Sequence, residues 1–161
     1  MGNGPSGSAE ADDSPAQLAR IDTQKPPFNL DDLNRQPVAL ADQRSEIVLV
    51  HFFATWCEPC RDELPALNRL VARTDPAKLR VLTISVAEVD VRVRNFVEKL
   101  PVSFPVLLDR DRSVAKTWNV SALPTTFILD RNLKPRLFVE RDYDWDRVDV
   151  RELLQSLGKD S

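Results

Sequence analysis

The feature that most constrains this chain is a buried apolar run that ends in two closely spaced cysteines and passes directly into a helical pattern. Residues 47–53 are rich in β-branched and aromatic side chains, which predicts a central strand buried on both faces. Cys57 and Cys60, the only cysteines, follow in a short loop, and leucines then recur at helical spacing over residues 59–73. A helix N-terminus offers unpaired N–H groups and the positive end of a dipole, and both stabilise a thiolate. The stretch therefore predicts thiol–disulfide chemistry at this cysteine pair.

The rest of the chain alternates apolar runs with segments whose apolar residues recur at helical spacing. The expected strands cover residues 47–53, 79–86, 104–108, 125–129 and 134–140. The expected helices cover residues 59–73, 89–100, 111–118 and 150–157. Short alternations at 28–30 and 38–40 predict a small hairpin ahead of them. This order predicts an α/β fold with a mainly parallel sheet covered on both faces, which the last two strands make mixed.

Composition narrows the class of protein. The chain has 161 residues, enough for one domain with its own core, and a formal net charge of -3. We expect no nucleic-acid partner, because no basic surface is available to bind phosphates. The apolar runs are far shorter than the roughly 20 residues that a membrane-spanning helix needs.

The N-terminal part differs from the rest in composition. Residues 1–26 are rich in Gly, Ser, Ala, Asp and Pro, which predicts a disordered tail before a domain at residues 27–158. Residues 1–8 are typical of an artificial leader joined to a truncated natural sequence. A signal peptide or anchor would then have been removed, and such an anchor is the only contact with a membrane that we expect.

Metal binding is the other common use of closely spaced cysteines. A structural zinc site needs four ligands as a rule, and beyond the pair the chain offers only His51 and carboxylates. Asp142, Asp144 and Asp146 have the spacing of part of a calcium loop without its flanking helices, so we interpret them as a solvated turn. We therefore expect neither a metal ion nor a cofactor.

Two separated stretches carry a family resemblance. Residues 53–60 read Phe-Ala-Thr-Trp-Cys-Glu-Pro-Cys, residues 61–65 continue as Arg-Asp-Glu-Leu-Pro, and residues 123–127 read Leu-Pro-Thr-Thr-Phe. The chain resembles the thioredoxin superfamily and, within it, the TlpA/ResA-like extracytoplasmic thiol–disulfide oxidoreductases. The resemblance covers residues 27–158. It implies a thioredoxin-like three-layer sandwich, in which a mixed central sheet has helices on both faces and an N-terminal hairpin extension.

The Cys-Glu-Pro-Cys motif suggests a role for each of its residues. Cys57, at the helix N-terminus, is expected to be the exposed nucleophile, and Cys60, one turn further on, the buried thiol that resolves the mixed disulfide. Pro59 suits the first helical turn, where no N–H donor is needed. Trp56 is expected to lie over the site and pack against a bound protein, beside Glu58 and Pro59.

The resemblance also points to residues outside the motif. It implies a cis peptide bond before Pro124, beside the cysteines, which would open the backbone of Leu123 to an extended substrate. Glu63 matches the glutamate of the ResA-type Cys-Glu-Pro-Cys-x-x-Glu arrangement and is our candidate for acid–base assistance, the alternative being an ordinary solvated helix residue. Negative charge on Glu58 and Glu63 would disfavour a thiolate, which predicts a reductant rather than an oxidant.

Histidine 51 departs from the thioredoxin pattern. His51 occupies the place of a buried aspartate that assists proton transfer in thioredoxin. Its possible roles are a packed residue, a proton relay or a metal ligand, and we favour packing. Trp118 and Trp145 are also assigned to packing.

These features predict an enzyme that reduces disulfides in extracytoplasmic proteins, and the resemblance makes cytochrome c maturation a specific case. The expected partners are a disulfide-containing protein and an upstream thiol electron donor, and the protein itself is expected to be a monomer. The resemblance implies a location in the bacterial periplasm or at the outer face of the membrane. The alternative is a thioredoxin-fold binding module with an idle cysteine pair. A peroxidase of related fold fits less well, because the chain lacks the Thr-x-x-Cys setting of a peroxidatic cysteine.

Overall fold

A six-stranded sheet forms the centre of the computed structural model, which describes residues 17–158. The strands are, in chain order, β1 (Ala19–Arg20), β4 (Ile47–Phe53), β5 (Leu79–Val86), β6 (Val106–Asp109), β7 (Thr125–Leu129) and β8 (Pro135–Val139). Their order across the sheet is β1-β8-β7-β4-β5-β6. The β4, β5 and β6 strands are parallel, whereas β7 runs antiparallel to β4 and pairs with β8. The mixed sheet expected from the sequence is confirmed.

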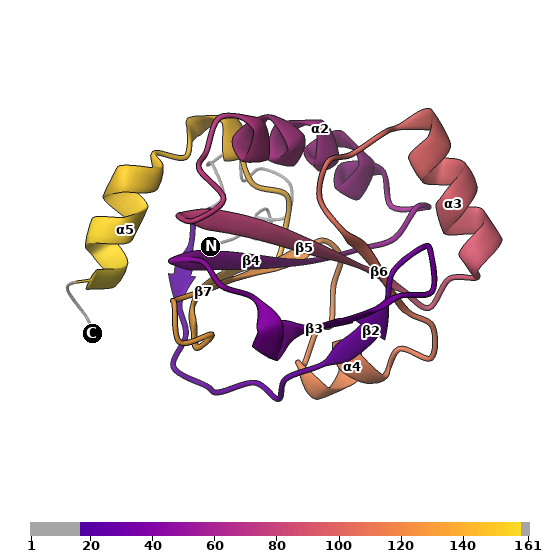
Figure 1. The fold of residues 1–161 in the computed structure, drawn as a ribbon, viewed down its shortest axis with the longest axis horizontal. Coiled ribbons are helices and arrows are strands. Elements are labelled where there is room, and N and C mark those ends of the chain that lie inside the picture. The colour runs from indigo at the N-terminus through magenta and orange to yellow at the C-terminus, as the bar shows by residue number, and fades with distance from the viewer. Residues whose placement is uncertain (1–16, 159–161) are drawn as a thin grey trace, which may run out of the picture.

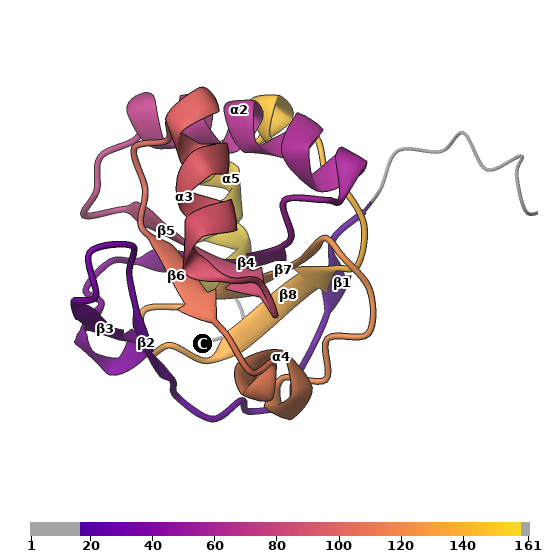
Figure 2. The same cartoon turned by 90° about the vertical axis from the view of Figure 1, so that its right-hand side faces the viewer.

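Helices cover both faces of this sheet (Figures 1 and 2). One face carries α2 (Glu58–Ala72), α3 (Asp90–Lys99) and α5 (Val150–Gly158). The other carries α4 (Ser113–Thr117) and the hairpin of β2 (Asn29–Asp31) and β3 (Pro37–Ala39). Within the described residues, two short 3-10 helices complete the fold, η2 (Leu40–Asp42) and η3 (Trp145–Arg147). Within residues 17–158, no helix combines the length and the apolar character that crossing a membrane requires.

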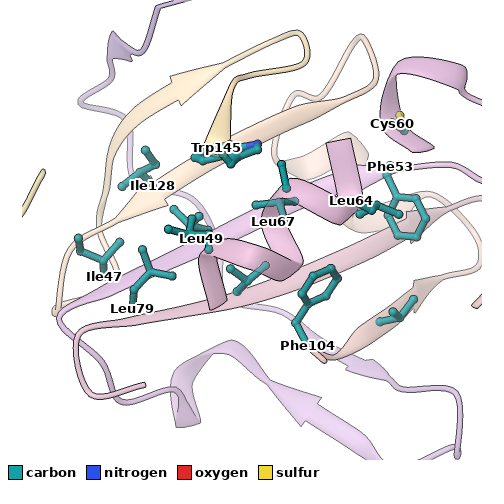
Figure 3. Packing of buried hydrophobic residues seen from close by; sticks show 14 of the residues in the cluster. Ile47, Leu49, Phe53, Cys60, Leu64, Leu67, Leu79, Phe104, Ile128 and Trp145 are labelled. Atoms are coloured by element: carbon teal, nitrogen blue, oxygen red, sulfur yellow. The ribbon is translucent and has the colours of Figure 1, made fainter. Parts of the chain in front are cut away.

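The central strand β4 is buried along its whole length and separates two hydrophobic clusters. Successive side chains of a strand point to opposite faces, so its odd-numbered residues face α2 and its even-numbered residues face α4. In Figure 3, Leu64 and Leu67 of α2 pack over this odd-numbered face, where Leu49 lies, and Cys60 lies at the edge of the cluster near Phe53. His51 has the parity of Leu49, and it therefore lies beneath α2.

The described end of the expected N-terminal tail is ordered. Ala19 and Arg20 pair with β8, and the Trp118 indole N–H donates to the Pro26 carbonyl at 2.9 Å. The disorder predicted for residues 1–26 is therefore wrong for these residues, because backbone pairing at the sheet edge fixes them. Residues 1–16, and with them the predicted leader, lie outside the described residues.

One strand begins later than the sequence predicts. The strand expected from residue 104 starts at Val106, and Pro105 precedes it. The Pro105 carbonyl accepts hydrogen bonds from the backbone N–H and the hydroxyl of Thr83, at 3.1 and 2.9 Å. Phe104 is buried in the cluster beneath α2 instead of pairing in the sheet. The apolar character of Phe104 correctly predicts that it is buried, but it does not indicate where the strand begins.

Candidate active site

The two cysteines lie where β4 passes into α2. Cys57 is the N-cap residue of α2 and forms a disulfide with Cys60, and their Cα atoms lie 5.2 Å apart. The backbone N–H of Cys60 points at the Cys57 sulfur, 3.3 Å away. Because the first N–H groups of a helix have no partner within the helix, this position stabilises a thiolate on Cys57. Pro59 lies in the first turn, as predicted.

The two sulfurs differ less in exposure than the sequence predicts. Cys60 is fully buried, as expected, but Cys57 is only 5% exposed. The Cys57 Sγ lies 3.8 Å from the carbonyl oxygen of Leu123, and the peptide bond from Leu123 to Pro124 is cis, as the resemblance implied. Cys57 is therefore more accessible than Cys60 but is still buried, because the Leu123–Pro124 segment and the disulfide cover it.

The outer surface of the site is formed by the residues around Cys57. Trp56 is 68% exposed, and Glu58 and Pro59 are exposed as well. The loop that carries Trp56 is anchored from below, because the backbone N–H of Thr55 donates to the buried Glu88 carboxyl at 2.9 Å and the Thr55 hydroxyl donates to the same group.

Glu88 is a residue that sequence reasoning missed. It also accepts a hydrogen bond from the Ser85 hydroxyl at 2.8 Å, and its side chain is 8% exposed. A glutamate two residues after a buried strand and three residues from a serine was the available signal. Its place beside the active-site loop follows only from the adjacency of β4 and β5.

Glu63 is buried beneath α2 and is not a solvated helix residue. Its Oε2 accepts hydrogen bonds from the Trp145 indole N–H and from the backbone N–H of Tyr143, the latter at 3.1 Å. Burial raises the pKa of the Glu63 carboxyl to about 8, outweighing the two hydrogen bonds that act in the opposite direction. Trp145, assigned to packing, does pack in the core, and it also holds this carboxyl group.

His51 lies opposite the other oxygen of Glu63. Its Nε2 is 3.7 Å from Glu63 Oε1, its Nδ1 is 2.8 Å from the Thr126 hydroxyl, and neither His51 nor Glu63 exposes its side chain. Burial lowers the pKa of the His51 imidazole to about 3. At neutral pH the two groups are therefore both uncharged, and the contact is not an ion pair.

This changes the expected electrostatics of the site. Glu63 adds no negative charge at pH 7, because a carboxyl with a pKa of about 8 is mainly protonated there. Of the two glutamates expected to repel a thiolate, only the exposed Glu58 can do so in the way predicted. Glu63 instead brings a proton to within one helical turn of Cys60, on the same face of α2.

Two of the three aspartates that resemble part of a calcium loop are paired with arginines. Asp146 makes a two-pronged ion pair with Arg69 of α2, with both N–O distances at 2.9 Å, and Asp144 pairs with Arg147. Arg73 donates to the carbonyl of Trp145 at 2.9 Å. The contacts of Arg69 and Arg73 fasten η3 to α2. In the part of the chain that the structure describes, no group of three or more His, Cys, Asp or Glu side chains could hold a metal ion.

The sequence and the fold of this chain are similar to those of known proteins. The family model described as "AhpC/TSA family" matches residues 21–136. The thiol-disulfide oxidoreductase ResA of Geobacillus thermodenitrificans is 31% identical over 137 residues, which is 85% of this chain and 78% of that protein. ResA of Bacillus cereus is 31% identical over 121 residues, covering 75% of this chain and 70% of the relative.

A solved structure of similar fold is a putative thiol:disulfide interchange protein DsbE from Chlorobium tepidum. It is 26% identical with a TM-score of 0.70, and the match covers 89% of this chain and 98% of that one. The α/β fold, the cysteine pair and these matches agree with one another.

Proposed function

This chain belongs to the AhpC/TSA family as a ResA-type thiol–disulfide oxidoreductase, and from this premise we propose that it works as a reductant of disulfides in extracytoplasmic proteins. The observation that carries the proposal is the Cys57–Cys60 disulfide at the start of α2, with a protonatable carboxyl buried one turn behind it. In the resting dithiol form, the Cys57 thiolate attacks one sulfur of the substrate disulfide. The other substrate sulfur leaves with the electron pair, and a mixed disulfide forms.

The second step closes the disulfide of the enzyme. Cys60 loses its proton and attacks the Cys57 sulfur, so that the substrate's second sulfur leaves as a thiolate and the substrate gains two electrons. An upstream dithiol donor then reverses these steps at the Cys57–Cys60 disulfide and is itself oxidised. The substrate and the donor share the outer surface around Cys57, where Trp56, Glu58, Pro59 and the Leu123–Pro124 backbone would contact them.

Glu63 is proposed as the acid and base for Cys60. When the donor attacks Cys57, the Cys60 thiolate leaves and takes the proton of the Glu63 carboxyl. When Cys60 later attacks, the proton returns to the Glu63 carboxylate. A raised pKa suits this role, because efficient proton transfer requires a pKa near the working pH.

The same proton transfer supports the reducing direction. Moving the proton to Cys60 leaves a carboxylate in a buried site, where charge is unfavourable. This cost destabilises the dithiol form relative to the disulfide, and destabilising the dithiol lowers the reduction potential. This argument replaces the one from fixed negative charge on Glu63.

An insulin-reduction assay with dithiothreitol tests the proposal. The wild-type protein should accelerate precipitation of the insulin B chain, and Cys57→Ser should not. Equal rates for the two proteins would favour the binding module with an idle pair. A reduction potential above about −150 mV would contradict the reducing direction, since the strong oxidant DsbA lies near −120 mV.

The substrate class is a finer part of the same proposal. From the resemblance to ResA-like oxidoreductases we propose as substrate the Cys-x-x-Cys-His disulfide of an apocytochrome c, with the protein acting as a monomer outside the cytoplasm. An oxidised Cys-x-x-Cys-His peptide should be reduced faster than the same peptide with His replaced by Ala. Equal rates would separate disulfide reduction from this specific substrate.

A further inference from the structure

Two buried polar atoms face one another behind the active-site helix. Across residues 17–158, three buried side-chain nitrogen or oxygen atoms lack a hydrogen-bond partner, and two of them are His51 Nε2 and Glu63 Oε1. They lie 3.7 Å apart, beyond the about 2.7–3.2 Å of a hydrogen bond, so a shift of under about 1 Å would join them. A hydrogen bond between them would remove the free-energy cost of burying both atoms without a partner.

The contacts of Glu63 decide which of its oxygens carries the proton. Oε2 accepts from the Tyr143 backbone N–H and the Trp145 indole N–H, and both of these groups can only donate. With two donors aimed at Oε2, the proton of the neutral carboxyl belongs on Oε1. Oε1 is the atom that faces His51.

The contacts of His51 allow its Nε2 to form a hydrogen bond with Glu63 Oε1 whether the carboxyl group is protonated or ionised. Its Nδ1 is 2.8 Å from the hydroxyl of Thr126, which lies opposite His51 in the β4–β7 register. A threonine hydroxyl can donate or accept, so it fits both neutral tautomers of the imidazole. In one tautomer Nε2 accepts from a protonated Oε1, and in the other Nε2–H donates to the carboxylate.

We propose that His51, held by Thr126, is a positioning residue for disulfide exchange. His51 accepts a hydrogen bond from the protonated Glu63, and it donates a hydrogen bond to the same oxygen once the proton has moved to Cys60. The proposal rests on the role of Glu63 as acid and base for Cys60. The step moves one proton from Oε1 to the Cys60 thiolate, while the electrons come from the donor dithiol. The imidazole keeps its own proton count: it gives up the proton on Nδ1 and takes one up on Nε2 by exchange with water, while the Thr126 hydroxyl turns from acceptor to donor.

Few other titratable groups face this pair. Cys60 lies one turn away on α2, and Tyr143 contributes only its backbone N–H. The exposed Asp142 also raises the pKa of Glu63, but it has a smaller effect than burial. On the far side of His51, Thr83 of β5 is its register partner, but the Thr83 hydroxyl donates to the Pro105 carbonyl. Thr83 and Thr126 therefore flank His51 symmetrically as its register partners, and of the two threonines only Thr126 is hydrogen-bonded to its ring.

That symmetry provides a matched set of variants. In oxidised protein, the carboxylic acid C=O band of Glu63 can be followed by infrared spectroscopy against pH and assigned by its loss in Glu63→Gln. His51→Leu removes a donor to the carboxylate, a stronger bond than the one lost by the neutral acid, so the titration midpoint should rise by about one pH unit. In Thr126→Val, an Nδ1–H would have no acceptor, so the tautomer with Nε2–H is favoured. Because Nε2–H donates to the Glu63 carboxylate, the titration midpoint should fall by about the same amount. Thr83→Val should leave it unchanged.

The outcomes separate this inference from the proposed function. Midpoint shifts of opposite sign in His51→Leu and Thr126→Val, with Thr83→Val unmoved, support the positioning role. Equal midpoints in all four proteins overturn it and leave His51 as a packed residue, whether or not the protein reduces insulin. If His51→Leu does not fold, Thr126→Val against Thr83→Val still decides. Failure of the wild-type protein to reduce insulin would overturn the proposed function without moving the infrared midpoints.

Discussion

The outer and inner sides of the first turns of α2 are built by different means. On the outer side, Trp56, Cys57, Glu58 and Pro59 are consecutive in the sequence, and Cys57 is the only one of them that is buried. On the inner side, the contacts of Glu63 come from β4 and from the connection between β8 and α5. The outer side presents a reactive sulfur to other proteins, whereas the inner side controls a proton out of reach of solvent.

The difference shows how an exchange site can separate recognition from proton control. The outer residues can change with the substrate while the buried carboxyl keeps its hydrogen bonds. The inner residues are coupled, because removing one leaves another buried polar atom without its partner. We therefore expect variants on the inner side to alter pH dependence and stability together.

The largest effect on the inner side is expected from Glu63→Gln. The amide can accept from Tyr143 and Trp145 and can donate to His51, so the fold should be preserved, but it cannot exchange a proton with Cys60. Turnover in the insulin assay should fall by about a hundredfold, the lower end of what general acid–base catalysis contributes. Wild-type turnover with Glu63→Gln would show that the inner side does not take part in the chemistry.

The corresponding support of the outer side is Glu88. In Glu88→Ala, the Thr55 N–H and the Thr55 and Ser85 hydroxyls lose their acceptor, which should cost about 1–3 kcal/mol of stability. The KM for a protein disulfide should rise, because the loop carrying Trp56 loses its anchor. Glu88→Gln is the matched control, since its amide oxygen can still accept from Thr55. Denaturant unfolding measures the first effect and initial rates the second, and an unchanged KM would argue against this anchoring role.

Stability against pH provides a third test of the inner side. The pKa of Glu63 rises from its ordinary value of 4.5 to about 8 in the folded protein, so the folded state keeps a proton that the unfolded chain releases in between. Glu63 therefore reduces stability as pH rises from 4.5 to about 8. His51 acts in the opposite sense, because its pKa falls from 6.5 to about 3 and stability is lost as pH falls through that window.

Between pH 4.5 and 6.5 the two contributions cancel. Urea unfolding across pH should show that Glu63→Gln removes the part of the alkaline loss that ends near pH 8. His51→Leu should remove part of the acidic loss below pH 4.5 and should leave stability falling as pH rises from 4.5, because Glu63 is then uncompensated. Parallel curves for the wild-type protein and both variants would contradict the burial of two neutral groups.

The sequence predicted the positions of the outer residues better than the contacts of the inner side, although it missed Glu88 and predicted a more exposed Cys57. Cys57, Pro59 and the Leu123–Pro124 segment lie in local motifs, whose chemistry and spacing are visible in a few residues. The partnership of Glu63 with Trp145 spans 82 positions and depends on η3, which the sequence analysis missed. His51 could have been placed beneath α2 from the alternation along β4, but its pairing with Thr126 required the register between β4 and β7.

The smallest effect is expected from the surface contacts that fasten η3 to α2. Arg69 and Asp146 are both exposed, and exposed ion pairs contribute little to stability even with good geometry. Arg69→Gln should lower the melting temperature slightly at low salt and hardly at all at high salt, with insulin reduction unchanged. A large loss of activity would mean that the position of Trp145 against Glu63 depends on this ion pair.

The most direct test of the account is to trap the mixed disulfide. Cys60→Ser keeps the nucleophile and removes the resolving thiol, and Cys57→Ser does the reverse. After incubation with an oxidised Cys-x-x-Cys-His peptide and acid quenching, mass spectrometry should find a covalent adduct on Cys57 of the Cys60→Ser protein and none on the Cys57→Ser protein. An adduct that forms faster on Cys60 of the Cys57→Ser protein would contradict the assignment of Cys57 as the nucleophile and Cys60 as the thiol served by Glu63.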